Sequence, residues 1–288
     1  MITTDILRQV LTDNRNLVAQ KKVFPRDIEI GELSRCVLVG VRRSGKSYLL
    51  FSKIQSLLAS GHSWDKVLYV NFEDERLMGF DVADFNKLLE VQAELSGKDS
   101  LPALFLDEVQ LIDGWEKFAR RMADAQAEIY ITGSNAKMLS IQIAAALGGR
   151  FLTVNVFPLN FSEYLKAKGV AVRKDVWSST TGKARILREF AEFFEYGGLP
   201  ECLQFSNKLE YINSVFQKIY LGDIIVRNKV TNALPLRILL KKVAESIGQP
   251  VSFTRLTNVI QSTGVKLAKN TCISYMQYAC EACLVLPF

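Results

Sequence analysis

The sequence predicts a doubly wound α/β domain followed by a mainly helical region. Between residues 35 and 157, short and almost continuously apolar runs alternate with longer amphipathic stretches, and such runs become rare after residue 157. Strands buried on both faces of a parallel sheet are apolar in this way, and their alternation with helices is typical of doubly wound domains. Strands are predicted over residues 36–39, 67–72, 103–106, 128–132 and 152–157, and helices over 46–60, 83–95, 115–125 and 136–147.

The composition is that of an ordinary globular protein. Of the 288 residues, 49% are hydrophobic and 23% are charged, and no apolar run approaches the roughly 18 residues that span a bilayer. The N-terminus lacks the basic-then-apolar order of a signal peptide, so a cytoplasmic location without membrane association is expected. The only histidine, His62, argues against Ser-His and Cys-His catalysis. Cys280 and Cys283 form one C-x-x-C without a second pair, which favours packed thiols over a metal or redox site.

A phosphate-binding motif, G-x-x-x-x-G-K-[ST], is complete at residues 40–47, between a predicted strand and a predicted helix. Its two glycines let the backbone approach phosphate oxygens closely, and the helix that follows adds its positive N-terminal dipole. Lys46 is expected to reach the β- and γ-phosphates, and Ser47 to offer its hydroxyl to Mg²⁺. The candidate nucleotide ligands are Gly40, Val41, Arg42, Arg43, Ser44, Gly45, Lys46, Ser47 and Tyr48.

Two acids, Asp107 and Glu108, follow the predicted strand 103–106. A buried strand that ends in an acid fits the element that holds Mg²⁺ beside a phosphate loop, so Asp107 is assigned to the metal. A carboxylate directly after it can orient and deprotonate the attacking water, which favours hydrolysis over kinase or GTPase chemistry. The GTPase motifs D-x-x-G and N-K-x-D are not matched, since residues 207–210 are N-K-L-E, and ATP is therefore the predicted nucleotide.

One predicted strand, 67–72, lies between the strand of the phosphate-binding motif and the strand that precedes Asp107. This insertion predicts a parallel sheet of order 2-3-4-1-5, in which the strand before the motif is strand 1. The inserted strand ends in three acids at residues 73–75, which are interpreted as a solvated turn rather than as a border of the site.

Polar residues after the fourth strand are candidates for positioning the attacking water. Asn135 and Ser134 are expected to point toward the γ-phosphate, with Thr132 behind them. The alternative is that Ser134 or Asn135 only caps the helix that follows, and one residue could do both.

Three arginines are candidates for sensing the γ-phosphate, from the same chain or from a neighbouring copy in an oligomer. Arg150 is favoured because it follows two glycines at the start of a strand. Arg120 and Arg121 lie on a predicted helix, where arginines are mostly solvated.

The region after residue 157 is predicted to be helical up to a short final strand. Two helices, a turn at Gly264 and the final strand fit a winged helix-turn-helix, and the unpaired strand predicts that the fold continues beyond the chain. The helices are predicted at 161–168, 184–196, 209–228, 236–247, 253–261 and 269–281, and the strand at 284–288. The predicted domains are 1–157 (nucleotide-binding, with an N-terminal helix), 158–232 (a helical lid or linker) and 233–288 (winged helix).

The basic residues are concentrated in the last part of the chain. Residues 208–288 hold ten Lys and Arg against four acids, a surplus of six that equals the net charge of the whole chain. Such a region is a candidate DNA-binding surface, with Lys266, Lys269 and Asn270 at the start of the helix that winged helices place in the major groove. The rest of that helix is poor in basic residues, which slightly favours contact with a protein partner instead.

Several segments together resemble the large prokaryotic family of AAA-type ATPases that carry a C-terminal domain of unknown function. They are G-V-R-R-S-G-K-S at 40–47, L-D-E-V-Q at 106–110, G-W-E-K-F at 114–118, I-T-G-S-N-A-K-M-L at 131–139 and F-P-L-N-F-S-E-Y-L at 157–165. The resemblance is strong from residue 35 to 165 and moderate from 197 to 223. It implies the roles given above for Lys46, Ser47, Asp107 and Glu108, and it places Arg150 in a Gly-Arg motif. It also implies a winged helix followed by a further region that this chain lacks.

The predicted function is a slow Mg²⁺-dependent ATPase whose hydrolysis drives a conformational change, in association with DNA. The alternative is a nucleotide-gated switch that recruits a protein partner through its C-terminal part. A small-molecule kinase is disfavoured by Glu108.

Overall fold

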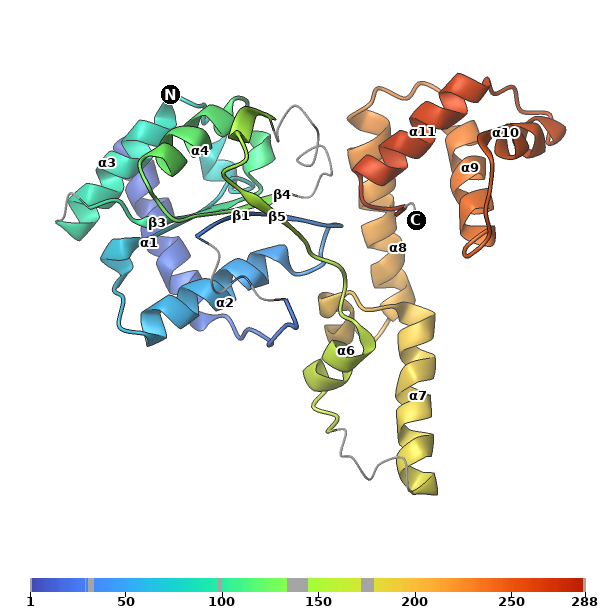
Figure 1. The fold of residues 1–288 in the computed structure, drawn as a ribbon, viewed down its shortest axis with the longest axis horizontal. Coiled ribbons are helices and arrows are strands. Elements are labelled where there is room, and N and C mark those ends of the chain that lie inside the picture. The colour runs from blue at the N-terminus through green and yellow to red at the C-terminus, as the bar shows by residue number, and fades with distance from the viewer. Residues whose placement is uncertain are drawn as a thin grey trace. The chain divides into compact units, whose positions relative to one another are not determined.

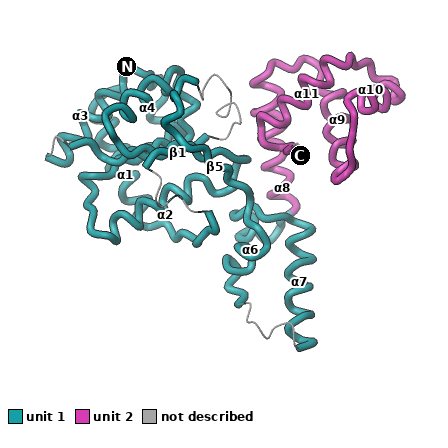
Figure 2. The backbone as a smooth tube through the Cα atoms, in the orientation of Figure 1, with its two compact units in different colours: residues 1–208 teal, residues 209–288 magenta. Residues whose placement is uncertain are grey.

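The computed structural model describes residues 2–28, 30, 34–97, 100–133, 145–171 and 179–286. The chain divides into two compact units, residues 1–208 and residues 209–288, which are coloured separately in Figure 2. We call them unit 1 and unit 2 and describe each by itself.

Unit 1 contains a five-stranded parallel sheet (Figure 1). The strand order is β2-β3-β4-β1-β5, and each neighbouring pair is parallel. The predicted α/β class and the order 2-3-4-1-5 are therefore confirmed. The strands are β1 (Arg35–Val39), β2 (Val67–Asn71), β3 (Ala103–Asp107), β4 (Ile129–Gly133) and β5 (Leu152–Asn155).

Helices cover both faces of the sheet, with α2 and α4 on opposite sides in Figure 1. On the α2 side, Leu50 and Ile54 belong to one buried cluster with Leu38, Phe105 and Tyr130 of the strands. Because β1 to β4 are buried from both sides, their sequences are almost wholly apolar, which is the pattern that predicted them, whereas the edge strand β5 is largely exposed. The helices of this part are α1 (Thr4–Gln20), α2 (Lys46–Ala59), α3 (Asp84–Ser96) and α4 (Trp115–Asp124), and the helix predicted over 136–147 lies mostly outside the described residues.

The second part of unit 1 is helical and follows β5 directly. It consists of α6 (Phe161–Ala167), α7 (Thr180–Tyr196) and a 3₁₀ helix (Pro200–Gln204). Its own apolar cluster includes Leu159, Tyr164 and Ile186. Helix α7 begins four residues earlier than predicted, because the Ser179 side chain accepts a hydrogen bond from the Gly182 N–H and caps the helix there.

A charged cluster joins α6 and α7. The Glu192 carboxylate accepts hydrogen bonds from Lys208 and, at 2.9 Å, from the ammonium of Lys168. These two lysines, Lys208 first, lower the pKa of Glu192 to about 2, against the opposing effect of burial.

We expect Glu192→Gln to lower the free energy of unfolding at pH 7 by about 1 kcal/mol, since the pair is partly exposed. A carboxyl whose pKa is lowered by folding stabilises the folded state above its unfolded pKa, here 4.5, and loses that effect as the pH falls toward 2. Urea unfolding at pH 7 and pH 3 tests this. The difference in the free energy of unfolding between wild type and Glu192→Gln should shrink by about half at pH 3. An undiminished difference would contradict the lowered pKa of Glu192.

Unit 2 is helical throughout its described residues. The helix predicted over 209–228 is present as α8 (Lys208–Lys218) continued by a π-helix (Ile219–Val226), and α9 (Ala233–Glu245), α10 (Phe253–Ser262) and α11 (Lys269–Glu281) follow. These last three helices pack pairwise against one another. Gly264 lies in the turn between α10 and α11 with φ of +84°, a left-handed conformation that favours glycine.

The strand predicted over 284–288 is wrong for residues 284–286, and residues 287–288 lie outside the described range. The N–H groups of Leu284 and Val285 both point back to the Ala279 carbonyl, at 3.0 and 3.3 Å, and so close the end of α11 instead of pairing in a sheet. Helices α10 and α11 and the turn between them are present where the sequence predicted them, whereas the winged helix stays a prediction. None of the helices in the described ranges has the length and apolar character needed to cross a bilayer.

Candidate nucleotide-binding site

The segment 40–47, which we call the phosphate loop, connects the end of β1 to the start of α2. Arg43 and Gly45 have φ of +63° and +98°, so the loop turns twice through the left-handed region before the helix begins. A Cβ atom on Gly40 would lie 2.1 Å from the carbonyl oxygen of Val156, so no larger residue fits there. Turns of this kind direct successive backbone N–H groups toward one point and form an anion-binding concavity.

Lys46 is folded back over the phosphate loop. Its side chain is only 4% exposed, and its ammonium donates hydrogen bonds to the carbonyls of Gly40 at 3.0 Å and Val41 at 3.1 Å. A carboxylate oxygen of Glu108 lies 4.0 Å from the same nitrogen. The ammonium therefore lies between the loop and the end of β3, where it could bind a negatively charged phosphate held by the loop.

Ser44 belongs to the phosphate loop and is fully buried. No described residue offers its hydroxyl a hydrogen-bond partner. An orphaned buried polar group of this kind is rare in a folded protein and tends to mark a functional site.

Asp107 ends β3 and is 1% exposed. Its carboxylate accepts hydrogen bonds from the Tyr69 hydroxyl at 2.9 Å, from the Thr132 hydroxyl, and from Ser47 of the phosphate loop. Burial raises the pKa of Asp107 and the neighbouring Glu108 acts in the same direction, whereas these three hydroxyls oppose the shift. A buried carboxylate with hydroxyl neighbours is a donor set that a hard divalent cation accepts.

Glu108 follows in a left-handed conformation, with φ of +53°, which is uncommon for a residue other than glycine. Its N–H donates to the Thr132 hydroxyl at 2.9 Å, and its carboxylate accepts from the Gln110 side chain at 2.6 Å. Backbone strain of this kind costs about 1–3 kcal/mol and is retained mainly at functional sites. The structure thus brings Lys46, Asp107 and Glu108 together, as the sequence predicted.

Tyr69 is not among the residues predicted from the sequence, and Thr132 is predicted there only behind other candidates. Both hydroxyls bind Asp107, and both come from strands that flank β3 in the sheet. The predicted strand order could have pointed to both residues, because side chains on the two strands next to β3 can reach its last residue, Asp107.

We expect Tyr69→Phe to lower the free energy of unfolding by about 1–3 kcal/mol, because Asp107 loses a buried hydrogen-bond donor. Tyr130→Phe is a matched control. Tyr130 is equally buried, but its hydroxyl binds the exposed Glu128 at 3.1 Å, and water can replace that donor. Urea denaturation of both variants measures the difference. Equal losses would show that the Tyr69 hydroxyl has no special partner in Asp107.

Three of the candidate arginines form ion pairs within unit 1. Arg42 of the phosphate loop forms an ion pair at 3.1 Å with Glu73, one of the three acids that were interpreted as a solvated turn. Arg43 of the same loop pairs with Glu201. Arg150 pairs with Asp124 at 2.6 Å.

Three further candidates are Arg121, Ser134 and Asn135. Arg121 binds the Asn86 side chain at 2.6 Å and lies over the Phe118 ring. Ser134 and Asn135 lie outside the described residues.

The sheet order, the phosphate loop and the acids at the end of β3 define the chain as a P-loop nucleotide-binding fold. Residues 34–165 match the family model of an AAA domain. This match confirms, over these residues, the resemblance to AAA-type ATPases seen in the sequence.

Related proteins extend further than this chain. It is 34% identical to the uncharacterized protein MJ1544 of Methanocaldococcus jannaschii, over 99% of this chain and 64% of that protein. It is 32% identical to an uncharacterized protein of Haemophilus influenzae, over 83% of this chain and 58% of that protein. The chain thus spans about three fifths of the length of these relatives.

Among solved structures, the Walker-type ATPase PABY2304 of Pyrococcus abyssi aligns over 98% of this chain and 90% of its own length. The TM-score is 0.48 and the sequence identity is 13%.

Proposed function

We propose that this protein is a Mg²⁺-dependent ATPase. The observation that carries the proposal is the convergence of Lys46, Asp107 and Glu108 at the carboxyl ends of β1 and β3. In this proposal the backbone of the phosphate loop and the Lys46 ammonium bind the β- and γ-phosphates of ATP. Three oxygens lie near the Lys46 ammonium, from the carbonyls of Gly40 and Val41 and the carboxylate of Glu108, so the ammonium would exchange these oxygen partners for those of the phosphates.

Ser47 and Asp107 are the residues that would hold Mg²⁺. They fit this role because a hydroxyl and a buried carboxylate lie within hydrogen-bonding distance of each other at the end of the loop. Bound Mg²⁺ neutralises the charge that develops on the phosphate oxygens during transfer. Tyr69 and Thr132 keep the Asp107 carboxylate in place.

Glu108 is the proposed general base. Its backbone is fixed by Thr132 and its side chain by Gln110, so the carboxylate is held where it can accept a proton from a water molecule that attacks the γ-phosphate. Hydrolysis is favoured over transfer to a metabolite because a carboxylate in this place activates water. Arg42 belongs to the loop and takes part in phosphate binding in this proposal, whereas Arg150 would first have to leave Asp124.

The proposal is tested by measuring phosphate release from ATP and from GTP, each with Mg²⁺ and with excess chelator. We expect release from ATP that requires Mg²⁺. Transfer of the phosphoryl group to a small-molecule acceptor without free phosphate would favour a kinase instead.

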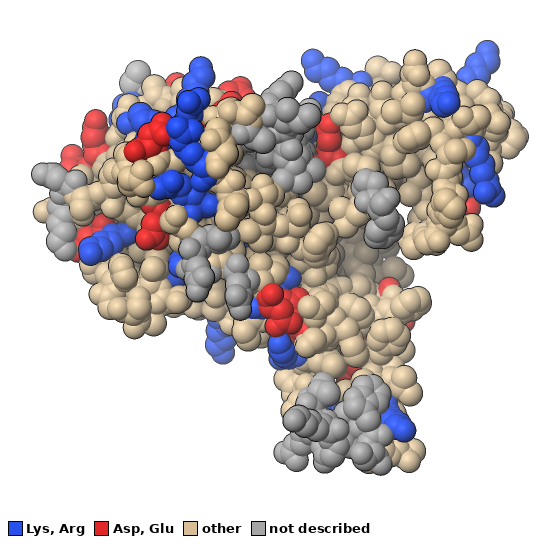
Figure 3. All heavy atoms as spheres, in the orientation of Figure 1, with Lys and Arg blue, Asp and Glu red and all other residues tan. Residues whose placement is uncertain are grey.

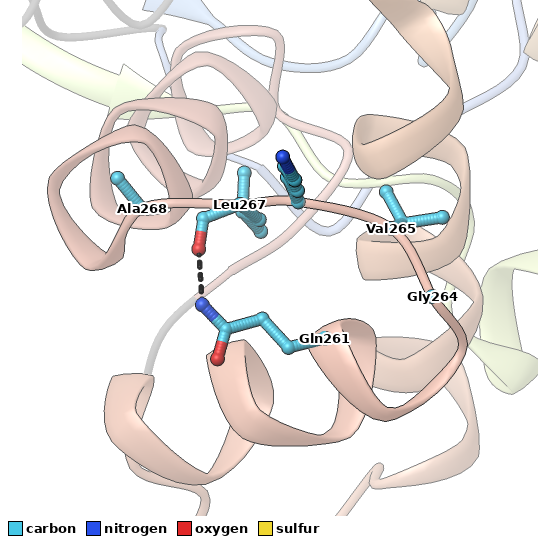
Figure 4. Close-up of a pocket in the computed structure, with 6 residues that line it drawn as sticks. Gln261, Gly264, Val265, Leu267 and Ala268 are labelled. Atoms are coloured by element: carbon cyan, nitrogen blue, oxygen red, sulfur yellow. Dashed lines mark hydrogen bonds between the residues drawn. The ribbon is translucent and has the colours of Figure 1, made fainter.

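A second proposal concerns DNA, and the basic surplus of residues 208–288 favours it. On the face of unit 2 seen in Figure 3, Lys and Arg outnumber the acids. The turn between α10 and α11 lines a cavity of about 440 Å³ whose walls include Lys266 (Figure 4). The Gln261 side chain braces this turn by donating to the Leu267 carbonyl at 2.8 Å. Helix α11 begins next to it at Lys269, without a side-chain cap on its first N–H groups.

If this surface binds DNA, duplex or single-stranded DNA should raise ATP turnover, and the affinity should fall steeply with salt. Lys266→Ala and Lys269→Ala together should reduce both the affinity and its salt dependence. Turnover that is indifferent to nucleic acid would favour the alternative, a nucleotide-gated switch that recruits a protein partner.

A further inference from the structure

A buried ion pair lies behind the phosphate loop, between residues that are far apart in the sequence. Nε of Arg26 is 2.8 Å from Oε1 of Glu163, and the two side chains are 7% and 3% exposed. Arg26 follows α1 in an extended segment, and Glu163 lies in the first turn of α6. No part of the proposed chemistry uses this pair.

The other nitrogens of Arg26 hold two carbonyl groups. Nη1 donates to the carbonyl of Ser44 in the phosphate loop at 3.0 Å, and Nη2 donates to the carbonyl of Phe157 after β5 at 2.9 Å. A Cβ atom on Gly45 would lie 3.3 Å from Nη1, so the guanidinium lies directly against the left-handed turn of the loop. Arg26 thus uses its planar fork to fix the loop to the end of the sheet.

The Ser44 carbonyl has a direct connection to phosphate binding. Ser44 C=O and Gly45 N–H belong to one planar trans peptide, in which the two groups point in opposite directions. When Arg26 holds the carbonyl from one side, the N–H is directed to the other side, where the motif presents its donors to phosphate. A phosphate that accepts from this N–H polarises the peptide and strengthens the bond from Arg26 to the carbonyl.

Glu163 carries the connection into α6. Its carboxylate also accepts from the N–H of Asp27 at 2.7 Å and from the N–H of Asn160 at 3.0 Å. The Asn160 side chain in turn accepts from the Glu163 N–H at 2.9 Å, and the two residues form a capping box at the start of α6. Burial alone would raise the pKa of Glu163, but the hydrogen bonds from Arg26, Asn160 and Asp27 hold it below its ordinary value.

The segment after α7 also lies against the loop. The Gly198 carbonyl accepts from the Leu159 N–H at 2.7 Å, and a Cβ atom on Gly198 would lie only 2.0 Å from the Leu159 carbonyl oxygen. Pro200 approaches the turn at Gly45, with 3.6 Å between its Cγ and the position of a Cβ there. The helical part of unit 1 is therefore in contact with the phosphate loop at more than one point.

We propose that Arg26 and Glu163 are positioning residues that couple nucleotide binding at the phosphate loop to α6. The coupling runs along one unbroken series of hydrogen bonds, from the Ser44 peptide through Arg26 and Glu163 to the first turn of α6. A bound nucleotide strengthens this series at its first bond and so stabilises the start of α6. This inference rests on the proposed nucleotide binding.

Hydrogen–deuterium exchange of the full chain, with and without ADP and Mg²⁺, tests the coupling. In the wild type, exchange should slow both in residues 40–50 and in α6, in the latter by at least about fivefold, the lower end of typical couplings between sites. In Arg26→Gln and in Glu163→Gln the response of α6 should disappear, while residues 46–50 at the start of α2 still respond. Arg26→Lys should restore little, because an ammonium cannot reach all three acceptors in the plane of the guanidinium.

A neighbouring pair provides the matched control. Lys166 and Asp27 lie 2.8 Å apart but are 51% and 47% exposed, and Lys166→Gln should leave the response of α6 unchanged. If Arg26 and Glu163 served stability alone, Arg26→Gln and Glu163→Gln would lower the unfolding temperature but leave the exchange response of α6 to ADP intact. That result would overturn the inference.

The wild type alone can also decide the matter, so the test does not depend on whether every variant folds. Slower exchange in residues 40–50 without any change in α6 would refute the coupling and leave the proposed function standing. The absence of any response to ADP, at concentrations up to the millimolar range, would instead count against the proposed function itself.

Discussion

Glu108→Gln should reduce the rate of ATP hydrolysis by about 10²- to 10⁴-fold, the usual contribution of a positioned general base. Glutamine has nearly the same shape and can still accept the hydrogen bond from Gln110, but it cannot take a proton from water. The left-handed backbone at residue 108 and its bond to Thr132 do not depend on the side-chain charge. The protein should therefore keep its fold and bind ATP with nearly unchanged affinity.

Phosphate release and ATP affinity should both be measured for this variant. Glu116→Gln, in the first turn of α4, is a control that removes one carboxylate from the same unit and should leave turnover unchanged. Retention of more than about a tenth of the wild-type rate by Glu108→Gln would exclude Glu108 as the base. The variant also helps to separate the ATPase associated with DNA from the nucleotide-gated switch. A switch would hold its protein partner in the ATP-bound form, which Glu108→Gln should make long-lived.

Lys46→Ala should weaken ATP binding by about 10- to 150-fold. The ammonium would otherwise form charge-assisted hydrogen bonds with phosphate, which contribute about 1.5–3 kcal/mol, and each 1.4 kcal/mol corresponds to tenfold in affinity. In the free protein the variant also removes the donor that the loop carbonyls and Glu108 share, which lowers the free energy of unfolding and is separate from the loss of ATP affinity.

Calorimetric titration with ATP and Mg²⁺ measures this loss. Lys53→Ala is the matched control, because Lys53 is on the same helix α2 but its ammonium lies over the Tyr130 ring, 5.6 Å from the ring centre. An affinity of Lys46→Ala within twofold of the wild type would contradict the assignment of the loop.

Much of the sheet and of the site could be predicted because the signals are local. Strands buried on both faces leave apolar runs of four or five residues, and the order in which these runs interrupt the helices predicted the inserted strand β2 and hence the sheet order. The phosphate loop and the acids at the end of β3 are continuous motifs, so Lys46, Asp107 and Glu108 could be named before the structure was known.

The contacts that support these residues were not predictable in the same way. Tyr69 reaches Asp107 across two neighbouring strands, and Arg26 reaches Glu163 over 137 positions of sequence. Neither pair leaves a local pattern, because an aromatic residue in a strand or an arginine in a loop is compatible with many partners. Glu73 lies in an exposed turn, as interpreted from the sequence, but its pairing with Arg42 was not predictable for a related reason, since Arg42 comes from a segment 31 residues earlier.

The end of unit 2 shows the limit of apolar patterning. The run Leu-Val-Leu-Pro-Phe at 284–288 resembles a strand in composition. Its first two N–H groups, however, close the last turn of α11 at Ala279. A short apolar run after a helix can thus close the C-terminal end of that helix instead of forming a strand, and composition alone does not distinguish these two structures.

The most direct test of the central claim is phosphate release from ATP by the purified chain, measured in parallel for the wild type and Lys46→Ala, with Mg²⁺ and with excess chelator. We expect release by the wild type that requires Mg²⁺ and that falls to background in Lys46→Ala. Equal release by the two proteins, or release that continues without Mg²⁺, would contradict the claim that the phosphate loop, Asp107 and Glu108 form an ATP-hydrolysing site.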